Sequence, residues 1–304
     1  MSVLVVDKPV GPTSFAVLRR VRRALMRAGS GTERAPKLGH GGTLDPMASG
    51  VLPVCVGEAT KVIPFLLDAD KEYLAVVRFG VETDTLDATG RVVSEKPVGE
   101  LDATRIEAAL VGFRGEIEQV PPMFSALKHQ GRPLYRYARA GQTIARAPRR
   151  VKVHDLSLLE WEPPDRARLR IRCSKGTYIR SLAADLGGQL GVGAHLTELR
   201  RTASGPFALA QALSLDDIDA WVNEGRDLPF VSLRDSLAHL AAVTVGDALA
   251  VRLARGQAMR WDEIAPATVE RGPLCVLLPP DVVIAVVDRT TEGAVRILRV
   301  FNVG

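Results

Sequence analysis

The strongest constraint on the fold is a strict alternation of apolar and charged side chains between Ala167 and Cys173. Leu169 and Ile171 stand between three arginines, and this period of two predicts a β-strand with one apolar and one charged face. Hydrophobic residues make up 46% of the 304 residues, enough to bury a sizeable core and to exclude general disorder. Related patterns predict further strands over Val3–Val6, Tyr73–Phe79, Val151–Glu160, Leu274–Leu278 and Val282–Val287.

Helical spacing of apolar residues, together with capping residues, predicts several helices. Ser14 is expected to cap a helix over about Phe15–Arg27, and Ser214 with Asp217 is expected to open another. Further helices are predicted over Ala103–Phe113 and from Ile179 to Gly187-Gly188. Near residue 240 the composition shifts to short β-rich pieces broken by Gly and Pro. We therefore expect two domains, residues 1–238 and 239–304.

Several classes of protein are disfavoured by what the sequence lacks. No apolar run approaches the ~20 residues that span a bilayer. The start of the chain has neither a basic segment nor a long apolar one, so we do not expect a secretory signal. Three widely spaced cysteines argue against disulfides, and five histidines without ligand spacing argue against a metal site. A cytoplasmic protein without membrane, metal or cofactor is expected.

Charge is distributed unevenly along the chain. The net charge is +5, and residues 240–304 hold seven basic and seven acidic residues, so the surplus lies before them. Lys128–Lys152 contains eight basic residues, two tyrosines and no acid. This composition favours a nucleic-acid-binding excursion over a solvated loop, which is the alternative. The arginines of the expected helix 15–27 fit either a solvated face or contact with a polyanion.

One carboxylate stands in an unusual loop, Gly39-His40-Gly41-Gly42-Thr43-Leu44-Asp45-Pro46. Glycine lets a backbone approach a ligand closely, and Pro46 fixes the chain directly after Asp45. The loop lacks the G-K-[ST] ending of a phosphate-binding loop, and the chain has no G-x-S-x-G elbow. From spacing alone Asp45 is equally compatible with a functional role and with ordinary turn chemistry.

A series of sequence blocks extends over roughly residues 3–205. The blocks are Leu4–Pro9 with Gly11, Thr13 and Ser14, Gly39–Pro46, Ala48–Pro53, Gly57–Lys61, Lys71–Tyr73, Thr83–Gly90, Pro121–Lys128, Cys173–Arg180 and Gly193–Arg201. Taken together, they resemble the TruB family of bacterial tRNA pseudouridine synthases, which modify uridine 55 in the T-loop. Gly41 and Phe124 depart from the family pattern, which often has Thr and Tyr there.

The resemblance implies a mixed α/β fold. Its catalytic domain would contain a large, mainly antiparallel sheet with a central cleft, followed by a small β-rich, PUA-like C-terminal domain. It also implies isomerisation of uridine without a cofactor or metal, with the T-arm of tRNA as partner and a monomeric protein. A basic insertion at about 121–152 would clamp the RNA and be poorly ordered without it. Its expected RNA-backbone contacts are Lys128, Arg132, Arg136, Arg139 and Arg146.

The resemblance also assigns roles to individual side chains. Asp45 would be the catalytic carboxylate, and Arg180 would pair with it. Tyr73 would stack on the target base, Tyr178 and Leu199 would line its pocket, and His40 would fill the place that the flipped base leaves. Lys8, Lys61, Asp84 and Asp87 match further motifs and are expected to be architectural or backbone-contacting.

Alternatives remain open at this point. Asp45 could attack the anomeric carbon of the ribose, or it could remove the neighbouring 2′ proton to give a glycal. A non-catalytic tRNA-binding or tRNA-folding protein would explain the charge but would leave the Asp45–Arg180 pair without a use. A glycosidase or nucleosidase is a third and weaker hypothesis, because it would usually need a second acid and a positioned water.

Overall fold

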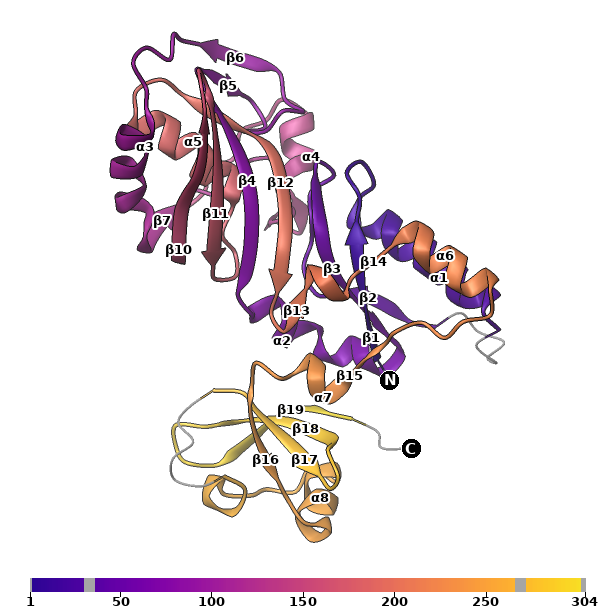
Figure 1. The fold of residues 1–304 in the computed structure, drawn as a ribbon. Coiled ribbons are helices and arrows are strands. Elements are labelled where there is room, and N and C mark those ends of the chain that lie inside the picture. Colours follow the sequence, from indigo (N-terminus) through magenta and orange to yellow (C-terminus); the bar gives the residue numbers. More distant parts are fainter. Residues whose placement is uncertain (1, 30–35, 266–271, 302–304) are drawn as a thin grey trace.

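The computed structural model describes residues 2–29, 36–265 and 272–301, and its main feature is one large sheet (Figure 1). Within these residues the sheet has 11 strands, ordered β14-β1-β3-β12-β4-β11-β10-β7, with β13, β15 and β2 pairing off that path. Only β1–β14 and β3–β12 pair in parallel, so the sheet is mainly antiparallel as expected. Its strands are β1 Ser2–Lys8, β2 Leu38–His40, β3 Ala48–Val56, β4 Lys71–Phe79, β7 Gly115–Gln119, β10 Arg149–Glu162, β11 Arg166–Cys173, β12 Ala194–Ser204, β13 Phe207–Ala208, β14 Leu213–Ser214 and β15 Val231–Ser232.

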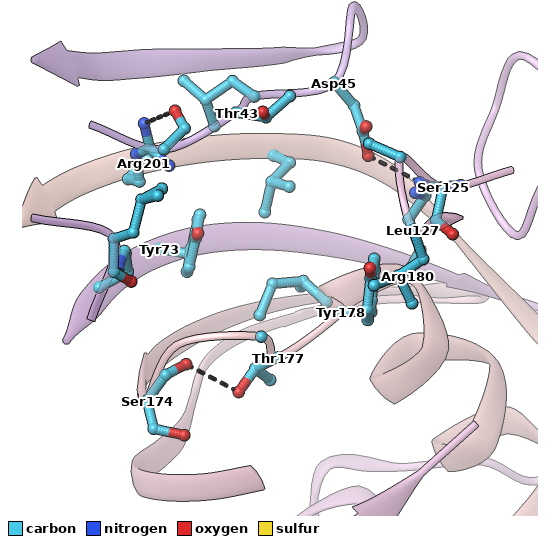
Figure 2. A pocket seen from close by; sticks show the side chains of 18 residues that line it. Thr43, Asp45, Tyr73, Ser125, Leu127, Ser174, Thr177, Tyr178, Arg180 and Arg201 are labelled. Carbon is cyan, nitrogen blue, oxygen red and sulfur yellow. Dashed lines mark hydrogen bonds and ion pairs between the residues drawn. The ribbon is translucent and has the colours of Figure 1, made fainter. Parts of the chain in front are cut away.

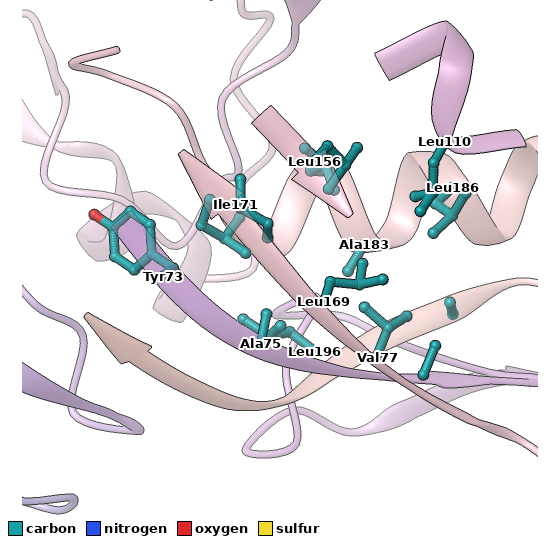
Figure 3. Packing of buried hydrophobic residues seen from close by; sticks show 14 of the residues in the cluster. Tyr73, Ala75, Val77, Leu110, Leu156, Leu169, Ile171, Ala183, Leu186 and Leu196 are labelled. Atoms are coloured by element: carbon teal, nitrogen blue, oxygen red, sulfur yellow. The ribbon is translucent and has the colours of Figure 1, made fainter. Parts of the chain in front are cut away.

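Alternation within β11 determines which face of this part of the sheet is buried. Leu169 and Ile171 are buried while Arg170 and Arg172 are exposed, which confirms the predicted period of two. Helices α3 (Ala103–Leu110) and α5 (Ile179–Gln189) contribute side chains to the cluster formed by the apolar face. In Figure 3, side chains of β4, β11, β12 and α5 meet in this core, and Tyr73 lies at one end with its hydroxyl pointing away.

The other half of the sheet is covered by two paired helices, α1 (Ser14–Arg27) and α6 (Leu215–Asn223), which lie side by side (Figure 1). Leu18 and Val21 of α1 join Ile218 of α6 and the strands β1 and β3 in a second cluster. Arg20 and Arg27 of α1 form ion pairs with Asp219 of α6. Among the residues described, the exposed Arg19, Arg22 and Arg23 are not paired with an acid, so part of the basic face stays available.

Two helix ends differ from the sequence prediction. Thr13, not Ser14, caps α1: its Oγ1 accepts a hydrogen bond from the Ala16 N–H at 3.1 Å. The Ser14 side chain turns inward and bonds Leu44 instead. Helix α5 continues through Gly187 and Gly188 to Gln189. A Cβ on Gly187 would lie 2.3 Å from the Ala194 nitrogen, so this glycine permits close packing rather than ending the helix.

The remaining elements are short. The helix predicted over Ala103–Phe113 changes from α3 to a 3-10 turn at Val111–Phe113. The other short elements are the hairpins β5 Val81–Thr83 with β6 Val92–Glu95 and β8 Lys128–His129 with β9 Arg132–Pro133, the helices α2 Ile63–Asp68, α4 Leu134–Arg139 and α7 Leu233–Ser236, and the 3-10 helices Gly57–Val62 and Leu209–Gln211. None of the helices in the described residues is long and apolar enough to cross a membrane.

A small second sheet forms the C-terminal part of the molecule, below the large sheet in Figure 1. Cys275, Val283 and Val286 of this sheet share one apolar cluster with Val3 and Val51 of the large sheet. The Lys61 ammonium also donates to the Val300 carbonyl at 3.0 Å, so the two parts are packed directly on each other. Its elements are β16 Ala241–Thr244, β17 Leu274–Leu278, β18 Val282–Arg289, β19 Val295–Val300, helix α8 Asp247–Ala254 and a 3-10 turn at Trp261–Glu263.

Candidate active site

The loop that carries Asp45 connects β2 to β3 and is fixed by buried polar contacts on both sides. The Ser14 hydroxyl donates to the Leu44 carbonyl at 3.0 Å and accepts from the Leu44 N–H at 2.9 Å. The Lys8 ammonium, which is fully buried, donates to the carbonyls of Pro46 and Ala48 at 3.4 and 2.6 Å. Burial lowers the pKa of Lys8 to about 8. Lys8 is thus architectural, as expected.

The Asp45 carboxylate pairs with Arg180 of α5. The Arg180 Nη2 atom lies 2.9 Å from Asp45 Oδ2, and Nη1 lies 3.6 Å from Asp87 Oδ2. The guanidinium also donates to the carbonyls of Thr85 and Phe124 at 2.9 and 2.8 Å. Only 4% of the Arg180 side chain is exposed, compared with 39% of the Asp45 side chain. A buried cation therefore holds a carboxylate whose outer part remains accessible.

A cavity of about 550 Å³ opens in front of this carboxylate (Figure 2). Its walls include Tyr73 from β4, Tyr178 directly before α5, and Leu199 from β12. We call it the Tyr73 cavity. The structure thus brings together five residues that are spread over more than 150 positions of the sequence: Asp45, Tyr73, Tyr178, Arg180 and Leu199. Its size and its aromatic and aliphatic walls fit a planar organic group.

Both tyrosines of the Tyr73 cavity are neutral at ordinary pH. Burial raises the pKa of the Tyr73 hydroxyl, and the neighbouring Arg201 guanidinium opposes that rise. Burial likewise raises the pKa of Tyr178, with Ser125 as the main opposing influence. Each phenol therefore keeps its proton and remains able to donate or accept a hydrogen bond.

His40 lies beside a second cavity of about 540 Å³, which shares Asp45 and Arg180 with the first. We call it the His40 cavity. The His40 Nδ1 atom is buried and has no hydrogen-bond partner within the described part of the chain. Burial, and then Arg201, lower the pKa of the imidazole. A neutral, flat ring with a free nitrogen thus stands near the catalytic candidate.

The basic segment, residues 121–152, forms the β8–β9 hairpin and helix α4 beside the site. Two arginines stack on tyrosines: Arg132 on Tyr137 at 4.9 Å and Arg139 on Tyr135 at 5.6 Å from the ring centroids. Arg139 also lines the His40 cavity. In the described parts of the chain, the five cations expected to contact RNA form no ion pair; they are Lys128, Arg132, Arg136, Arg139 and Arg146.

Two buried charged residues of the site escaped the sequence reasoning as participants. Arg201 is 1% exposed, lines the Tyr73 cavity, and donates to the carbonyls of Val51 and Gly42 at 2.7 and 3.0 Å. The adjacent pair Arg200-Arg201 in a strand was an available signal, because neighbouring residues point to opposite faces. Asp87 was expected to be architectural, and it binds the same guanidinium as Asp45.

No described group of three or more His, Cys, Asp or Glu side chains is arranged to hold a metal ion in residues 2–29, 36–265 and 272–301.

Comparison with protein families gives two adjoining matches. Residues 30–179 match the model "TruB family pseudouridylate synthase (N terminal domain)", and residues 180–239 match "tRNA pseudouridylate synthase B C-terminal domain". A tRNA pseudouridine synthase B of Chromohalobacter salexigens is 52% identical over 263 residues, covering 86% of this chain and 82% of the relative. One of Cupriavidus pinatubonensis is 46% identical over 300 residues, covering 97% and 92%.

Solved structures share the whole architecture. A chain of the "Crystal Structure of a Cbf5-Nop10-Gar1 Complex" superposes with a TM-score of 0.77 at 32% identity, covering 99% of this chain and 85% of that one. A chain of the "Structure of H/ACA RNP bound to a substrate RNA containing 2'-deoxyuridine" gives a TM-score of 0.74 at 29% identity, with coverage of 99% and 85%. The expected mixed α/β fold with a small C-terminal β domain is thereby confirmed.

Proposed function

This chain belongs to the TruB family of pseudouridylate synthases and is a tRNA pseudouridine synthase, and from that premise we propose that it isomerises uridine 55 in the T-loop of tRNA with Asp45 as the catalytic carboxylate. One observation carries this assignment most directly. The Asp45 side chain is the partly exposed acid shared by both cavities, and a buried guanidinium lies 2.9 Å from it. The neighbouring guanidinium fixes the position of the carboxylate at the edge of the cavity.

The chemistry follows from where charge develops. When the N1–C1′ bond of uridine breaks, the electron pair stays on the uracil and the ribose carbon becomes electron-poor. A carboxylate stabilises or captures that carbon, by attack on C1′ or by removal of the 2′ proton. The base then turns, and C5 bonds to C1′ as the bond from Asp45 to C1′ breaks or as Asp45 returns the 2′ proton. The C5 proton passes to solvent, and N1 takes up a proton. Enclosing walls favour retention of the detached base and exclusion of water.

The other site residues take their proposed roles from position and chemistry. Tyr73 stacks on the uracil, while Tyr178 and Leu199 form walls of its pocket. Arg180 orients the Asp45 carboxylate through their ion pair. His40 takes the place of the flipped base in the RNA stack, a role that suits a flat, neutral ring. This division of labour agrees with two cavities that meet at Asp45.

We propose that the basic segment grips the backbone of the tRNA T-arm. Its cations Lys128, Arg132, Arg136, Arg139 and Arg146 have no carboxylate partner among the described residues, so phosphate oxygens satisfy them without breaking internal ion pairs. Arginine is well suited to this contact because its planar group donates two parallel hydrogen bonds. We further propose that the catalytic domain spans residues 1–238 and that residues 239–304 form a PUA-like domain.

Release of tritium from tRNA that carries 5-tritiated uridine tests the catalytic proposal. The wild-type protein should release label without freeing uracil, whereas Asp45→Asn should bind tRNA and release none. Asp216→Asn is the matched control, because this carboxylate lies on α6 and is 90% exposed. A tRNA with cytidine at position 55 should release no label.

Two results would overturn the proposal. Full turnover by Asp45→Asn would exclude that carboxylate as the catalytic group, and free uracil in place of pseudouridine would indicate a glycosidase. Label release from the cytidine-55 tRNA at the normal rate would place the target uridine elsewhere.

A further inference from the structure

An exposed aromatic side chain at the start of α1 has no part in the mechanism above. Phe15 is 66% exposed, although a residue of this size contributes most to stability when it is buried. It lines the His40 cavity together with Asp45. An exposed aromatic ring on the wall of this cavity can be reached by a group that enters it.

The position of Phe15 is rigidly defined. Its neighbour Ser14 is bonded through its hydroxyl to both backbone groups of Leu44, the residue before Asp45. Thr13 caps the same helix end through Ala16. Phe15 follows Ser14 and Asp45 follows Leu44, so the buried Ser14–Leu44 contact holds the two residues near each other. A ligand that occupies the site at Asp45 places its neighbouring groups within the same cavity.

A cation accompanies the ring. The Arg19 guanidinium lies 5.7 Å from the Phe15 ring centroid, one helical turn away, and is exposed without an ion-pair partner in the described residues. The same combination occurs on the basic segment, where Arg139 lies over Tyr135 and both line this cavity. Arginine–aromatic pairs suit unpaired nucleotides, because the ring stacks on a base while the guanidinium contacts phosphate.

We propose that the Phe15–Arg19 pair is a binding subsite for an unpaired nucleobase adjacent to the target uridine. This inference rests on the proposed function, because it takes the RNA to be bound with its reacting uridine at Asp45. The base stacks on the Phe15 ring, and Arg19 contacts the phosphate of that nucleotide. The pair thereby helps to separate the bases beside the target, in addition to the contacts made by the basic segment.

Binding measurements with a T-arm stem-loop RNA test this subsite in the Asp45→Asn background. The Phe15→Ala variant should bind the intact RNA about fivefold to 100-fold more weakly, the range supplied by stacking of one base. Phe15→Trp should restore the affinity. Met26→Ala is the matched control, because Met26 is an exposed apolar residue near the other end of α1, at 58% exposure.

An abasic RNA identifies the contact as a base. Abasic sites are placed in turn on the 5′ and the 3′ side of the target uridine. At one of them, the RNA should lose affinity for the Phe15 protein but lose no further affinity for Phe15→Ala. Equal losses with all RNAs, or unchanged binding by Phe15→Ala, would overturn the subsite. Turnover by the wild-type protein, measured separately, shows whether the proposed function stands when the subsite fails.

Discussion

Charges are treated in opposite ways in two neighbouring regions of the molecule. Around Asp45, the Arg180 guanidinium is surrounded by two carboxylates and two backbone carbonyls and is almost fully buried. In the basic segment, Lys128, Arg132, Arg136, Arg139 and Arg146 are mostly exposed and form no ion pair within the described residues, although Arg150 lies 4.0 Å from Glu118. The first region is complete before substrate arrives, which suits catalysis by a preorganised site. The second has unpaired cations, which suits the proposed contact with the RNA backbone.

A third set of arginines shows that composition alone does not distinguish these cases. Arg168 and Arg170 of β11 also lie on a surface, but each pairs with an acid of β10: Glu162 at 3.2 Å and Asp155 at 3.3 Å. The alternating arginines of β11 and the arginines of the basic segment look equally basic in sequence. Ion pairing distinguishes Arg168 and Arg170 from the unpaired Arg136, Arg139 and Arg146.

The largest expected effect follows from breaking the buried region. Arg180→Ala leaves Asp45 and Asp87 without their shared cation, which should cost about 3–5 kcal/mol of unfolding free energy. Turnover in the tritium assay should fall by about 100-fold or more, since a misplaced group costs that much. Arg180→Lys keeps the charge but not the planar donor geometry and should be intermediate in both measurements. Arg168→Ala is the control, and wild-type turnover by Arg180→Ala would contradict the comparison.

The next effect concerns the open region. The combined change of Arg136, Arg139 and Arg146 to Ala should weaken tRNA binding and flatten its salt dependence by about two to three in the slope of log K against log salt concentration. The turnover of bound tRNA should change little by comparison. The matched variant, with Arg166, Arg168 and Arg170 of β11 changed to Ala, should keep the wild-type slope. Equal slopes for the wild-type protein and the first variant would refute a backbone-gripping role.

A smaller effect is expected from loosening the loop without touching a charge. Ser14→Ala removes the hydroxyl that bonds both backbone groups of Leu44. Leaving these buried groups unsatisfied should cost about 1–3 kcal/mol in urea unfolding. The maximal rate should fall while the dissociation constant for tRNA stays close to that of the wild-type protein. Weaker tRNA binding with an unchanged maximal rate would contradict this prediction and would indicate that the Ser14–Leu44 contact serves RNA binding.

The smallest effect is a pH dependence of stability. Because burial lowers the pKa of His40 in the folded protein, the unfolded chain binds this proton more readily. Stability supplied by neutral His40 is therefore complete above pH 6.5 and is lost as pH falls below it. The wild-type protein should lose more stability than His40→Gln between pH 7 and 5, as measured by urea unfolding at both pH values. A larger loss of stability in His40→Gln than in the wild-type protein would contradict a lowered pKa of His40 in the folded state.

Local pattern predicted the strands well because alternation reports burial directly. The segment Ala167–Cys173 lies within β11, and Tyr73–Phe79 lies within β4. The ends of helices were less predictable, since Thr13 and Ser14 have the same capping chemistry and only the contact with Leu44 distinguishes them. The two glycines of α5 resemble a stop signal, but Gly187 serves the packing of a strand that lies later in the chain.

The residues of the site were predictable only where a known motif indicated that residues far apart in sequence lie close together in the fold. The glycine-rich loop directed attention to Asp45, and the family resemblance supplied Arg180 and Tyr73. Nothing local indicated that Asp87 binds the same guanidinium, or that Arg201 is buried between the loop and β3. Such contacts join segments far apart in sequence, so residue spacing carries no information about them.

The apolar cluster that joins Cys275, Val283 and Val286 to Val3 and Val51 bears on how the protein can be shortened. A chain that ends at residue 238 would lack the small sheet, so the apolar side chains of β1 and β3 that pack against it would be exposed to water. We expect such a fragment to precipitate or self-associate rather than to survive as a miniature enzyme. The small C-terminal sheet thus stabilises the large sheet by covering its apolar surface, whatever it contributes to RNA binding.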